Sequence, residues 1–314
     1  MKILVTGGQG YKGSVLIPKL LDKGYEVISF DIGWFGDHLP NHQNLVKVVG
    51  DLRDTDTVPI DNVNCIIHLA SIANDPCSDL NPKLTWETSC LATMMLIEKA
   101  SRNGVSQFIY ASSGSVYGVN DAENITENLN LNPISEYNKT KMVSERVLLS
   151  YKDKMSIQII RPATVCGYSP RTRLDVSVNL LTAQAILKNS ITVLGGSQTR
   201  PNIHIKDICN VYLHFLERPK LTGIFNAGFE NLSIMEIANK IKLKTGAEII
   251  VEPSNDPRSY RINSDKLLKT GYLPKYNVDY AIDELLINFQ NGKLKDEPHL
   301  YNLKWMIKND YSKV

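Results

Sequence analysis

The chain has 314 residues, of which 43% are hydrophobic and 22% are charged, and its formal net charge is +2. This balance is ordinary for a globular protein with a large core, and it gives no reason to expect nucleic acid or a membrane as partner. Since no apolar run reaches the ~20 residues of a membrane span and no signal-peptide pattern opens the sequence, we expect a cytoplasmic location.

The first 165 residues alternate short β-branched runs with longer helical patterns. Unbroken apolar strands that alternate with helices are typical of a parallel sheet covered on both faces. The sequence therefore predicts an α/β fold with a Rossmann-type doubly wound parallel sheet. The expected strands are Lys2–Val5, Glu26–Phe30, Leu45–Val49, Cys65–Leu69, Gln107–Ala111 and Ile157–Arg161, and the expected helices include Gly13–Lys23, Leu84–Asn103 and Ser135–Tyr151.

The alternation changes after Gly167, and the later segments predict a smaller, discontinuous C-terminal lobe over the carboxyl edge of the sheet. The expected division is 1–167 plus 202–230 for the Rossmann-type domain and 168–201 plus 231–314 for the lobe. The tail after Gly292 carries no clear pattern. The expected elements are helices near Val176–Leu187, Ile234–Lys244 and Val278–Gln290, and strands near Ile191–Leu194, Ile224–Ala227 and Glu248–Val251.

A glycine-rich turn joins the first strand to the first helix. Gly7, Gly10 and Gly13 have a G-x-x-G-x-x-G spacing, and Tyr11 and Lys12 lie between the last two. Glycine allows a tight turn and a close approach of the backbone to a diphosphate, and the following helix offers unpaired N–H groups. The turn therefore predicts a dinucleotide site.

Two acidic residues follow the next strands. A carboxylate at Asp31, about twenty residues beyond the glycines, binds ribose hydroxyls and repels a 2′-phosphate, which favours NAD over NADP. Asp51 is expected beside the adenine, although each acid alone is also typical of a simple turn. The residues expected to bind NAD are Gly7, Gly10, Tyr11, Lys12, Gly13, Asp31, Asp51, Leu52, Leu69, Ala70, Tyr137 and Lys141.

A catalytic group is predicted where the fifth strand ends. Tyr137 and Lys141 are four residues apart, so a helix places them on one face. A nearby ammonium and a positive nicotinamide ring favour the phenolate, which takes a proton from a sugar hydroxyl while hydride leaves the same carbon. Ser113 is expected to orient that hydroxyl.

These motifs resemble the extended short-chain dehydrogenase/reductases, in particular their nucleotide-sugar epimerase and dehydratase branch. The markers are the glycine turn, Asp31, Asp51-Leu52, His68-Leu69-Ala70, Ser112-Ser113, Val116-Tyr117-Gly118, Tyr137-x-x-x-Lys141 and Arg161-Pro162. The resemblance implies that Ser113, Tyr137 and Lys141 are catalytic, that His68 is structural, and that the protein is a homodimer through helices 84–103 and 135–151. One departure is Ser89, where the family usually has Asn.

The resemblance also implies a nucleotide-sugar substrate held by the C-terminal lobe. Arginine suits bidentate binding of phosphate. Asn179, Arg200 and Arg258 are expected to hold the diphosphate of the substrate, Arg171 and Arg173 are further candidates, and Thr164 is expected to contact the substrate. The run from Ser169 to Asp175 also resembles dehydrogenases that oxidise GDP-manno-heptose at C4 for surface polysaccharides.

The family's reactions begin with oxidation at C4 of the sugar and diverge afterwards. A 4,6-dehydratase needs an acid after the serine, where this chain has Gly114 and Ser115, and the 3,5-epimerase/reductases have a cysteine near Ser115. Two activities remain open. One is a 4-epimerase, which is the more common activity in the family, and the other is a 4-dehydrogenase that releases the ketone. The third possibility, a non-catalytic NAD-binding scaffold, is disfavoured because Tyr137 and Lys141 are both present.

The five cysteines are scattered and form no C-x-x-C pair. This arrangement predicts buried thiols in a reducing compartment rather than disulfides or a zinc site. We therefore expect no bound metal. The cysteines are Cys65, Cys77, Cys90, Cys166 and Cys209.

Overall fold

The computed structural model describes residues 1–119, 122, 124–254 and 259–313. Its largest feature is a seven-stranded parallel sheet with the order β10-β6-β5-β4-β1-β2-β3. The order reverses between β1 and β4, so the predicted doubly wound sheet is confirmed. The strands are β1 (Lys2–Thr6), β2 (Glu26–Asp31), β3 (Leu45–Val49), β4 (Cys65–His68), β5 (Gln107–Ala111), β6 (Ser156–Pro162) and β10 (Gly223–Ala227).

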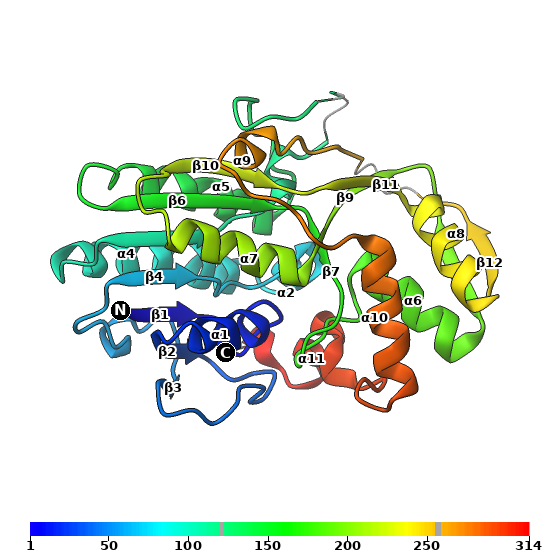
Figure 1. Ribbon diagram of the computed structural model, residues 1–314, viewed down its shortest axis with the longest axis horizontal. Helices are drawn as coiled ribbons and strands as arrows, with labels where there is room; N and C mark the ends of the chain where they lie inside the picture. Colours follow the sequence, from blue (N-terminus) through cyan, green and yellow to red (C-terminus); the bar gives the residue numbers. More distant parts are fainter. Residues whose placement is uncertain (120–121, 123, 255–258, 314) are drawn as a thin grey trace.

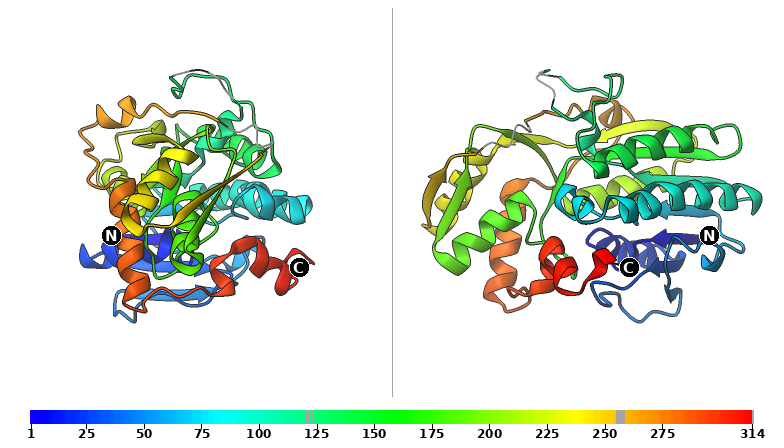
Figure 2. Two further views of the ribbon diagram at one scale, coloured as in Figure 1. Left: turned by 90° about the vertical axis from the view of Figure 1, so that its right-hand side faces the viewer. Right: turned by 180° about the vertical axis from the view of Figure 1, so that it is seen from behind.

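Helices cover both faces of this sheet because both faces are apolar (Figure 1). Helices α1 (Gly13–Asp22) and α7 (Ile205–Leu216) pack on one face, and α4 (Ala92–Arg102) and α5 (Glu136–Leu149) on the other, as the views in Figure 2 show. The strands between them are almost fully buried, as a sheet with two covered faces requires.

The lobe lies beyond the carboxyl ends of the strands, at the right of Figure 1. Its core joins α6 (Ser177–Lys188), α8 (Ile234–Thr245) and α10 (Val278–Gln290) to a parallel pair of strands, β8 (Ser190–Leu194) and β12 (Glu248–Glu252). A three-stranded sheet connects this lobe to the larger unit. Its strands are β7 (Thr164–Cys166), β9 (Thr199–His204) and β11 (Glu230–Ser233).

The predicted helix Leu84–Asn103 is divided in the structure. It begins as α3 (Pro82–Trp86), continues through a π-helical turn (Glu87–Leu91) and becomes α4, preceded by an unexpected short helix α2 (Asp75–Leu80). The apolar spacing does not reveal the extra residue of a π turn, so the sequence indicated one continuous helix.

Parts of the expected lobe pack on the larger unit. Leu267, in α9 (Asp265–Leu268), and Tyr272 belong to the apolar core around α1 and α7. The C-terminal helix α11 (Asn302–Lys308) lies against Trp34 and Phe35, which follow β2. The chain therefore returns to the first domain twice after residue 231. Short 3₁₀ turns complete the structure at Thr55–Thr57, Gly114–Tyr117, Pro298–Leu300 and Tyr311–Lys313.

Candidate active site and cofactor cleft

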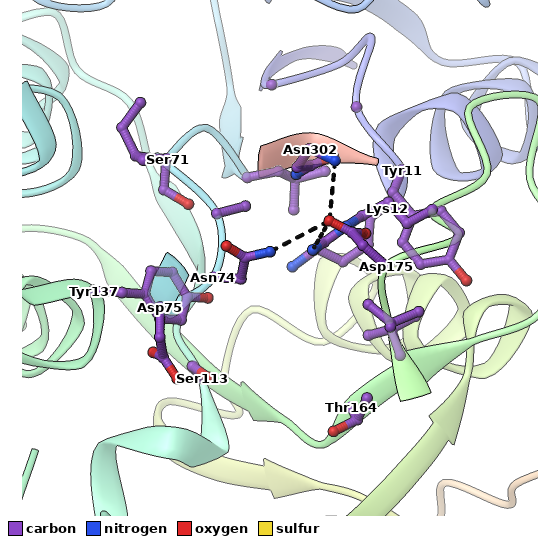
Figure 3. A pocket seen from close by; sticks show the side chains of 18 of the residues that line it. Tyr11, Lys12, Ser71, Asn74, Asp75, Ser113, Tyr137, Thr164, Asp175 and Asn302 are labelled. Carbon is purple, nitrogen blue, oxygen red and sulfur yellow. Dashed lines mark hydrogen bonds and ion pairs between the residues drawn. The ribbon is translucent and has the colours of Figure 1, made fainter. Parts of the chain in front are cut away.

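A cavity of about 700 Å³ lies between the carboxyl edge of the large sheet and the lobe. Of the predicted site residues that the structure describes, all except Asn179 line it. Arg258 falls outside the part of the chain that the structure describes. One continuous space therefore joins the glycine-rich turn to Ser113, Tyr137 and the lobe arginines. Figure 3 shows side chains that line part of it, among them Lys12, Ser113 and Tyr137.

The glycine-rich turn has no space for side chains. Gly7 has a φ of 71°, and a Cβ there would lie 2.7 Å from the backbone nitrogen of Ala70. A Cβ on Gly13 would lie 2.4 Å from the carbonyl oxygen of Gly8. Helix α1 therefore starts directly against the turn, with its N–H groups at the cavity, as diphosphate binding requires. Lys12 lies beside them, and burial lowers the pKa of its ammonium to about 8.

The carboxylate of Asp31 is held at the end of β2 by two backbone N–H groups. Gln9 donates to it at 3.0 Å and Gly33 at 2.8 Å, and burial raises its pKa. Each carboxylate oxygen accepts more than one hydrogen bond, so capacity remains for two ribose hydroxyls. Asp51, which lines the cavity with Leu52, is paired with Arg53 at 2.6 Å. This arrangement fits the adenosine half of NAD.

Tyr137 and Ser113 form the polar centre of the other half of the cavity, away from Asp31 and Asp51. The phenol of Tyr137 hydrogen bonds to the side chain of Ser113. The hydroxyl of Ser113 also lies 2.7 Å from that of Ser115, which in turn donates to Asn138. Burial raises the pKa of Tyr137 to about 12, and the Ser113 hydrogen bond opposes this shift. Without a bound cation the tyrosine is therefore a neutral phenol at pH 7.

Lys141 lies one helical turn below the tyrosine and is fully buried. Its ammonium donates to the carbonyl of Ala111 at 2.8 Å and lies 5.7 Å from the ring centre of Tyr137. Burial, followed by the positive charge of Lys12, lowers its pKa. The structure thus brings Ser113, Tyr137 and Lys141 together, although their roles in catalysis remain a prediction.

Ser89, the departure from the family pattern, lies in the π-helical turn. Its hydroxyl accepts a hydrogen bond from the N–H of Ile72 at 3.1 Å, and its carbonyl accepts one from Ser144 of α5 at 3.0 Å. The serine therefore connects the cavity wall after β4 with the helix that presents Tyr137.

His68 is fully buried between Thr6 and Thr93, and burial lowers its pKa to about 3, which fits the structural role expected for it.

Arg171 and Arg173 lie near the cofactor half of the cavity. Arg171 is 1% exposed, stacks 4.0 Å from the ring centre of Phe35, and donates to Asn302 at 2.5 Å. Burial lowers its pKa to about 9. Arg173 forms a bidentate pair with Asp175 at 2.8 and 3.1 Å. Arg171 thus lies beside the residues after β2, whereas the charge of Arg173 also acts on Tyr137, and the expectation that the two arginines bind the substrate stays a prediction.

Asp175 connects three distant segments over the cavity (Figure 3). Besides Arg173, it accepts hydrogen bonds from the backbone of Asn302 at 3.0 Å and from the amide of Asn74 at 3.4 Å. Burial alone would raise the pKa of Asp175, but Arg173 and Arg171 hold it below its usual value. No motif in the sequence indicated that Asn74 or Asn302 would line the site.

Of the remaining residues expected to contact the substrate, Thr164 and Arg200 line the cavity and Asn179 does not. Thr164 and Arg200 line the lobe side of the cavity. Asn179 is fully buried and its amide is used within the protein: it accepts from the N–H of Gly167 at 2.9 Å and donates to Tyr11 at 3.1 Å and to the carbonyl of Arg173 at 2.8 Å. Its placement does not support contact with a substrate; it instead positions the loop that carries Arg173.

Asp75 is a further residue that sequence reasoning missed. It lines the cavity beside Tyr137 and Ser113 (Figure 3). Nothing local in the sequence distinguishes it from an ordinary acid in the first turn of a helix.

Within the described ranges, no group of three or more His, Cys, Asp or Glu side chains is placed to hold a metal, and no helix is long and apolar enough to span a membrane.

Comparison with known proteins agrees with this geometry. A sequence model of the NAD dependent epimerase/dehydratase family matches residues 3–228. A putative UDP-glucose 4-epimerase of Methanocaldococcus jannaschii is 28% identical over 302 residues, with 92% of this chain and 99% of the relative covered.

Two solved structures share the fold. A UDP-glucose 4-epimerase of Thermotoga maritima with UDP-glucose has a TM-score of 0.85 at 24% identity, covering 94% of this chain and 100% of that one. The protein MoeE5, in complex with UDP-glucuronic acid and NAD, has a TM-score of 0.83 at 24% identity and the same coverage.

Proposed function

Because this chain belongs to the NAD-dependent epimerase/dehydratase family, we propose that it is a nucleotide-sugar 4-epimerase that acts through a 4-keto intermediate. The observation that carries the proposal is the cluster of Ser113, Tyr137 and Lys141 at the floor of the cavity that also contains the glycine-rich turn. A sugar that contacts Ser113 and Tyr137 lies at the nicotinamide end of a dinucleotide bound along the turn.

The side chains have separable tasks in this reaction. Tyr137 takes the proton of the C4 hydroxyl as the carbon is oxidised, and returns it when the ketone is reduced. Ser113 donates a hydrogen bond to the same oxygen, and the Lys141 ammonium favours the phenolate over the phenol. NAD, when bound, supplies the hydride acceptor and then the hydride donor. Inversion follows when the ketone presents its opposite face before reduction.

Residues 114 and 115 support epimerisation over dehydration. A 4,6-dehydratase of this family uses an acid after the serine, whereas Gly114 leaves no room for one. A Cβ at this position would lie 2.3 Å from the side chain of Ile262 and 3.1 Å from the carbonyl oxygen of Pro162. Ser115 has no acidic proton to transfer at neutral pH.

The C-terminal helix supports retention of the cofactor, which an epimerase needs. Asn302 at its start lines the cavity, and the indole of Trp305 donates to the carbonyl of Trp34 at 2.8 Å. Trp34 also stacks on Tyr311 with ring centres 4.7 Å apart. These contacts hold the C-terminal segment beside the residues expected at the adenosine ribose. A retained cofactor favours a cycle of oxidation and reduction over release of the ketone.

The lobe residues Thr164 and Arg200 are proposed to hold the nucleotide end of the substrate, and Arg258 with them.

A homodimer through α4 and α5 completes the proposal. Exposed apolar side chains on the α4 segment, Leu91, Met94 and Met95, support such an interface. Light scattering that gives the mass of one chain would contradict it.

The test begins with protein purified without added cofactor, which is unfolded so that its released nucleotides can be separated. Stoichiometric NAD or NADH, followed by inversion at C4 of a UDP- or GDP-sugar, supports the epimerase. Protein without cofactor that instead generates NADH at 340 nm and releases a ketone is a 4-dehydrogenase. If a Tyr137→Phe variant retains full activity, catalysis by this site is excluded, and a role as an NAD-binding scaffold becomes the better explanation.

A further inference from the structure

One buried guanidinium in the cavity wall carries hydrogen-bond donors that the protein does not use. Arg171 is 1% exposed and lines the cavity. Its Nη2 donates to the side chain of Asn302, another residue of the cavity wall (Figure 3), but among the described residues neither Nε nor Nη1 has a hydrogen-bond partner. A buried charge with unpaired donors costs free energy unless a ligand accepts from them. The side chain of Arg171 is therefore suited to an anionic ligand.

The loop that carries Arg171 is attached to the glycine-rich turn. In this loop, which follows β7, the hydroxyl of Ser169 donates to the carbonyl of Tyr11 at 2.9 Å and lies 2.7 Å from the hydroxyl of Ser14 in α1. The same hydroxyl accepts from the backbone N–H of Arg171 at 3.2 Å. These contacts hold the backbone of Arg171 beside the turn at which the N–H groups of α1 meet the cavity.

The side chain of Arg171 reaches the residues at the end of β2. Its guanidinium lies 4.0 Å from the ring centre of Phe35. Burial raises the pKa of Asp31, and hydrogen bonds from Gly33 and Gln9, followed by the charge of Arg171, act in the opposite direction. The guanidinium therefore lies between the glycine-rich turn and the site expected for the adenosine ribose. In a dinucleotide bound along the turn, the anionic group between these two places is the diphosphate.

We propose that Arg171 is a cofactor-binding residue, whose Nε and Nη1 donate to the diphosphate of NAD from the lobe while the N–H groups of α1 bind it from the Rossmann-type domain. The cofactor then joins the two parts of the protein, and its release requires the loop after β7 to move. This role differs from the contact with the substrate that is expected for Arg171 from the sequence. It rests on NAD as the cofactor and not on epimerisation of the sugar.

The surroundings of Arg171 orient its fork before the cofactor binds. A guanidinium presents several N–H donors in one plane, and this geometry matches two oxygens of a phosphate. Asn302 holds one nitrogen and Phe35 covers a face of the plane. A donor that is ordered in advance loses little conformational entropy on binding, so that its contacts slow release of the ligand. Arg173 is less suited to this task because two of its nitrogens already donate to Asp175.

The test measures how tightly the enzyme holds NAD, without catalysis. Isotopically labelled NAD is bound to the protein, and its release into an excess of unlabelled NAD is timed. Arg171→Met removes the donors but keeps an apolar side chain against Phe35. We expect this variant to bind NAD about tenfold to a hundredfold more weakly, mostly through faster release. Arg171→Lys keeps the charge without the fork and should recover part of this loss. Arg218→Met, which changes an exposed arginine just after α7, is the matched control and should release NAD at the unaltered rate.

Two fragments of the cofactor distinguish the diphosphate from the ribose. ADP contains the adenosine ribose and a diphosphate, whereas adenosine has no phosphate. Competition with labelled NAD gives the affinity of each. We expect Arg171→Met to weaken ADP by about the same factor as NAD and to leave adenosine unchanged. Binding of UDP-glucose and of GDP-mannose should also be unchanged, because the ligand of Arg171 is the cofactor.

Thermal unfolding with and without NAD separates ligand binding from a structural role. In the cofactor-free protein Arg171 is a buried charge with unpaired donors, so Arg171→Met should unfold at the same temperature or at a higher one. The rise in unfolding temperature that NAD causes should be smaller in this variant. A structural arginine would give the reverse, a less stable cofactor-free protein with an unchanged response to NAD.

Three results overturn the inference. The first is unchanged release of NAD from Arg171→Met, and the second is an equal loss of affinity for adenosine, which would place the guanidinium at the ribose. The third is weaker binding of the sugar nucleotides while NAD is unaffected, which would restore the expected contact with the substrate. Since none of these measurements needs turnover, an enzyme that holds NAD through Arg171 but does not invert C4 contradicts the epimerase alone.

Discussion

The carboxylate of Glu145 and the guanidinium of Arg161 form a bidentate ion pair inside the protein, at 2.6 and 2.9 Å, with side chains that are 1% and 2% exposed. Glu145 belongs to α5, eight residues after Tyr137, and Arg161 belongs to β6. The same carboxylate accepts from Ser112 at 2.5 Å. The pair therefore fixes α5, the helix that carries Tyr137 and Lys141, against the sheet beside Ser113.

Replacing Glu145 with Gln leaves the Arg161 charge buried without its counter-ion. We expect the free energy of unfolding to fall by about 3–5 kcal/mol, measured by denaturant titration. The matched control is Glu98→Gln, which removes an exposed i,i+4 partner of Arg102 and should cost about 0.5 kcal/mol or less. A Glu145 variant no less stable than this control would contradict the structural role of the pair.

The choice between NAD and NADP is expected to depend on Asp31. In Asp31→Ala the ribose hydroxyls lose their acceptor, so NAD affinity should fall about tenfold to a hundredfold, whereas NADP binding should weaken less or improve because the repelling charge is gone. Fluorescence titration with the reduced cofactors measures both. Asp22→Asn, on the exposed end of α1, is the control. An unchanged NAD to NADP ratio would exclude this role for Asp31.

The pH dependence of catalysis should follow the ionisation of Tyr137. Burial raises the pKa of this phenol to about 12 before a cationic cofactor is bound. Because the reactive form is the phenolate, kcat/KM should rise about tenfold per pH unit through neutral pH and level off where the phenol of the loaded enzyme ionises. A rate that is independent of pH between 6 and 8 would show that the phenolate is already formed, or that another group is the base.

Removing the hydroxyl should abolish this pH dependence along with most of the activity. We expect Tyr137→Phe to lower kcat by about 10²–10⁴ and to leave NAD bound, because the ring remains in place. Tyr151→Phe, beyond the end of the same helix, should be fully active. Loss of NAD from Tyr137→Phe would instead indicate that the hydroxyl is needed for cofactor binding.

Acid should destabilise the protein through His68. Burial lowers the pKa of this imidazole to about 3 in the folded protein, against about 6.5 when unfolded. Between these two pKa values the unfolded chain binds a proton at His68 and the folded chain does not. The stability contribution of neutral His68 is therefore complete above pH 6.5. It is lost as the pH falls toward 3, by about 1.4 kcal/mol of unfolding free energy per pH unit.

The comparison that isolates this effect is with His68→Gln, which cannot titrate. The stability advantage of the unaltered protein over the variant should shrink by about 2 kcal/mol between pH 7 and pH 5, as measured by denaturant titration at each pH. Other titrating groups contribute to both proteins and cancel in the difference. A difference that stays constant across this range would show that the imidazole of His68 has the same pKa in the folded and in the unfolded protein.

Local sequence was sufficient for the sheet and the glycine turn. The strands are continuous β-branched runs that must be buried on both faces, and the spacing of Gly7, Gly10 and Gly13 specifies a turn against a helix whatever packs around it. Tyr137 and Lys141 are one helical turn apart, so their shared face also follows from the chain alone.

Tertiary structure decided the rest of the site. Asp175, Asn74 and Asn302 meet although they are far apart in the sequence, because α2, the loop after β7 and α11 converge on one cavity. The same packing stacks Arg171 on Phe35, pairs Arg173 with Asp175 and buries the amide of Asn179. The direction of a long side chain depends on which distant neighbours exclude water from it, and no periodicity along the chain encodes that. Sequence by itself therefore determined the fold and the shared helix face of Tyr137 and Lys141. The surroundings of these two side chains, including Asp75, were decided only by the folded protein.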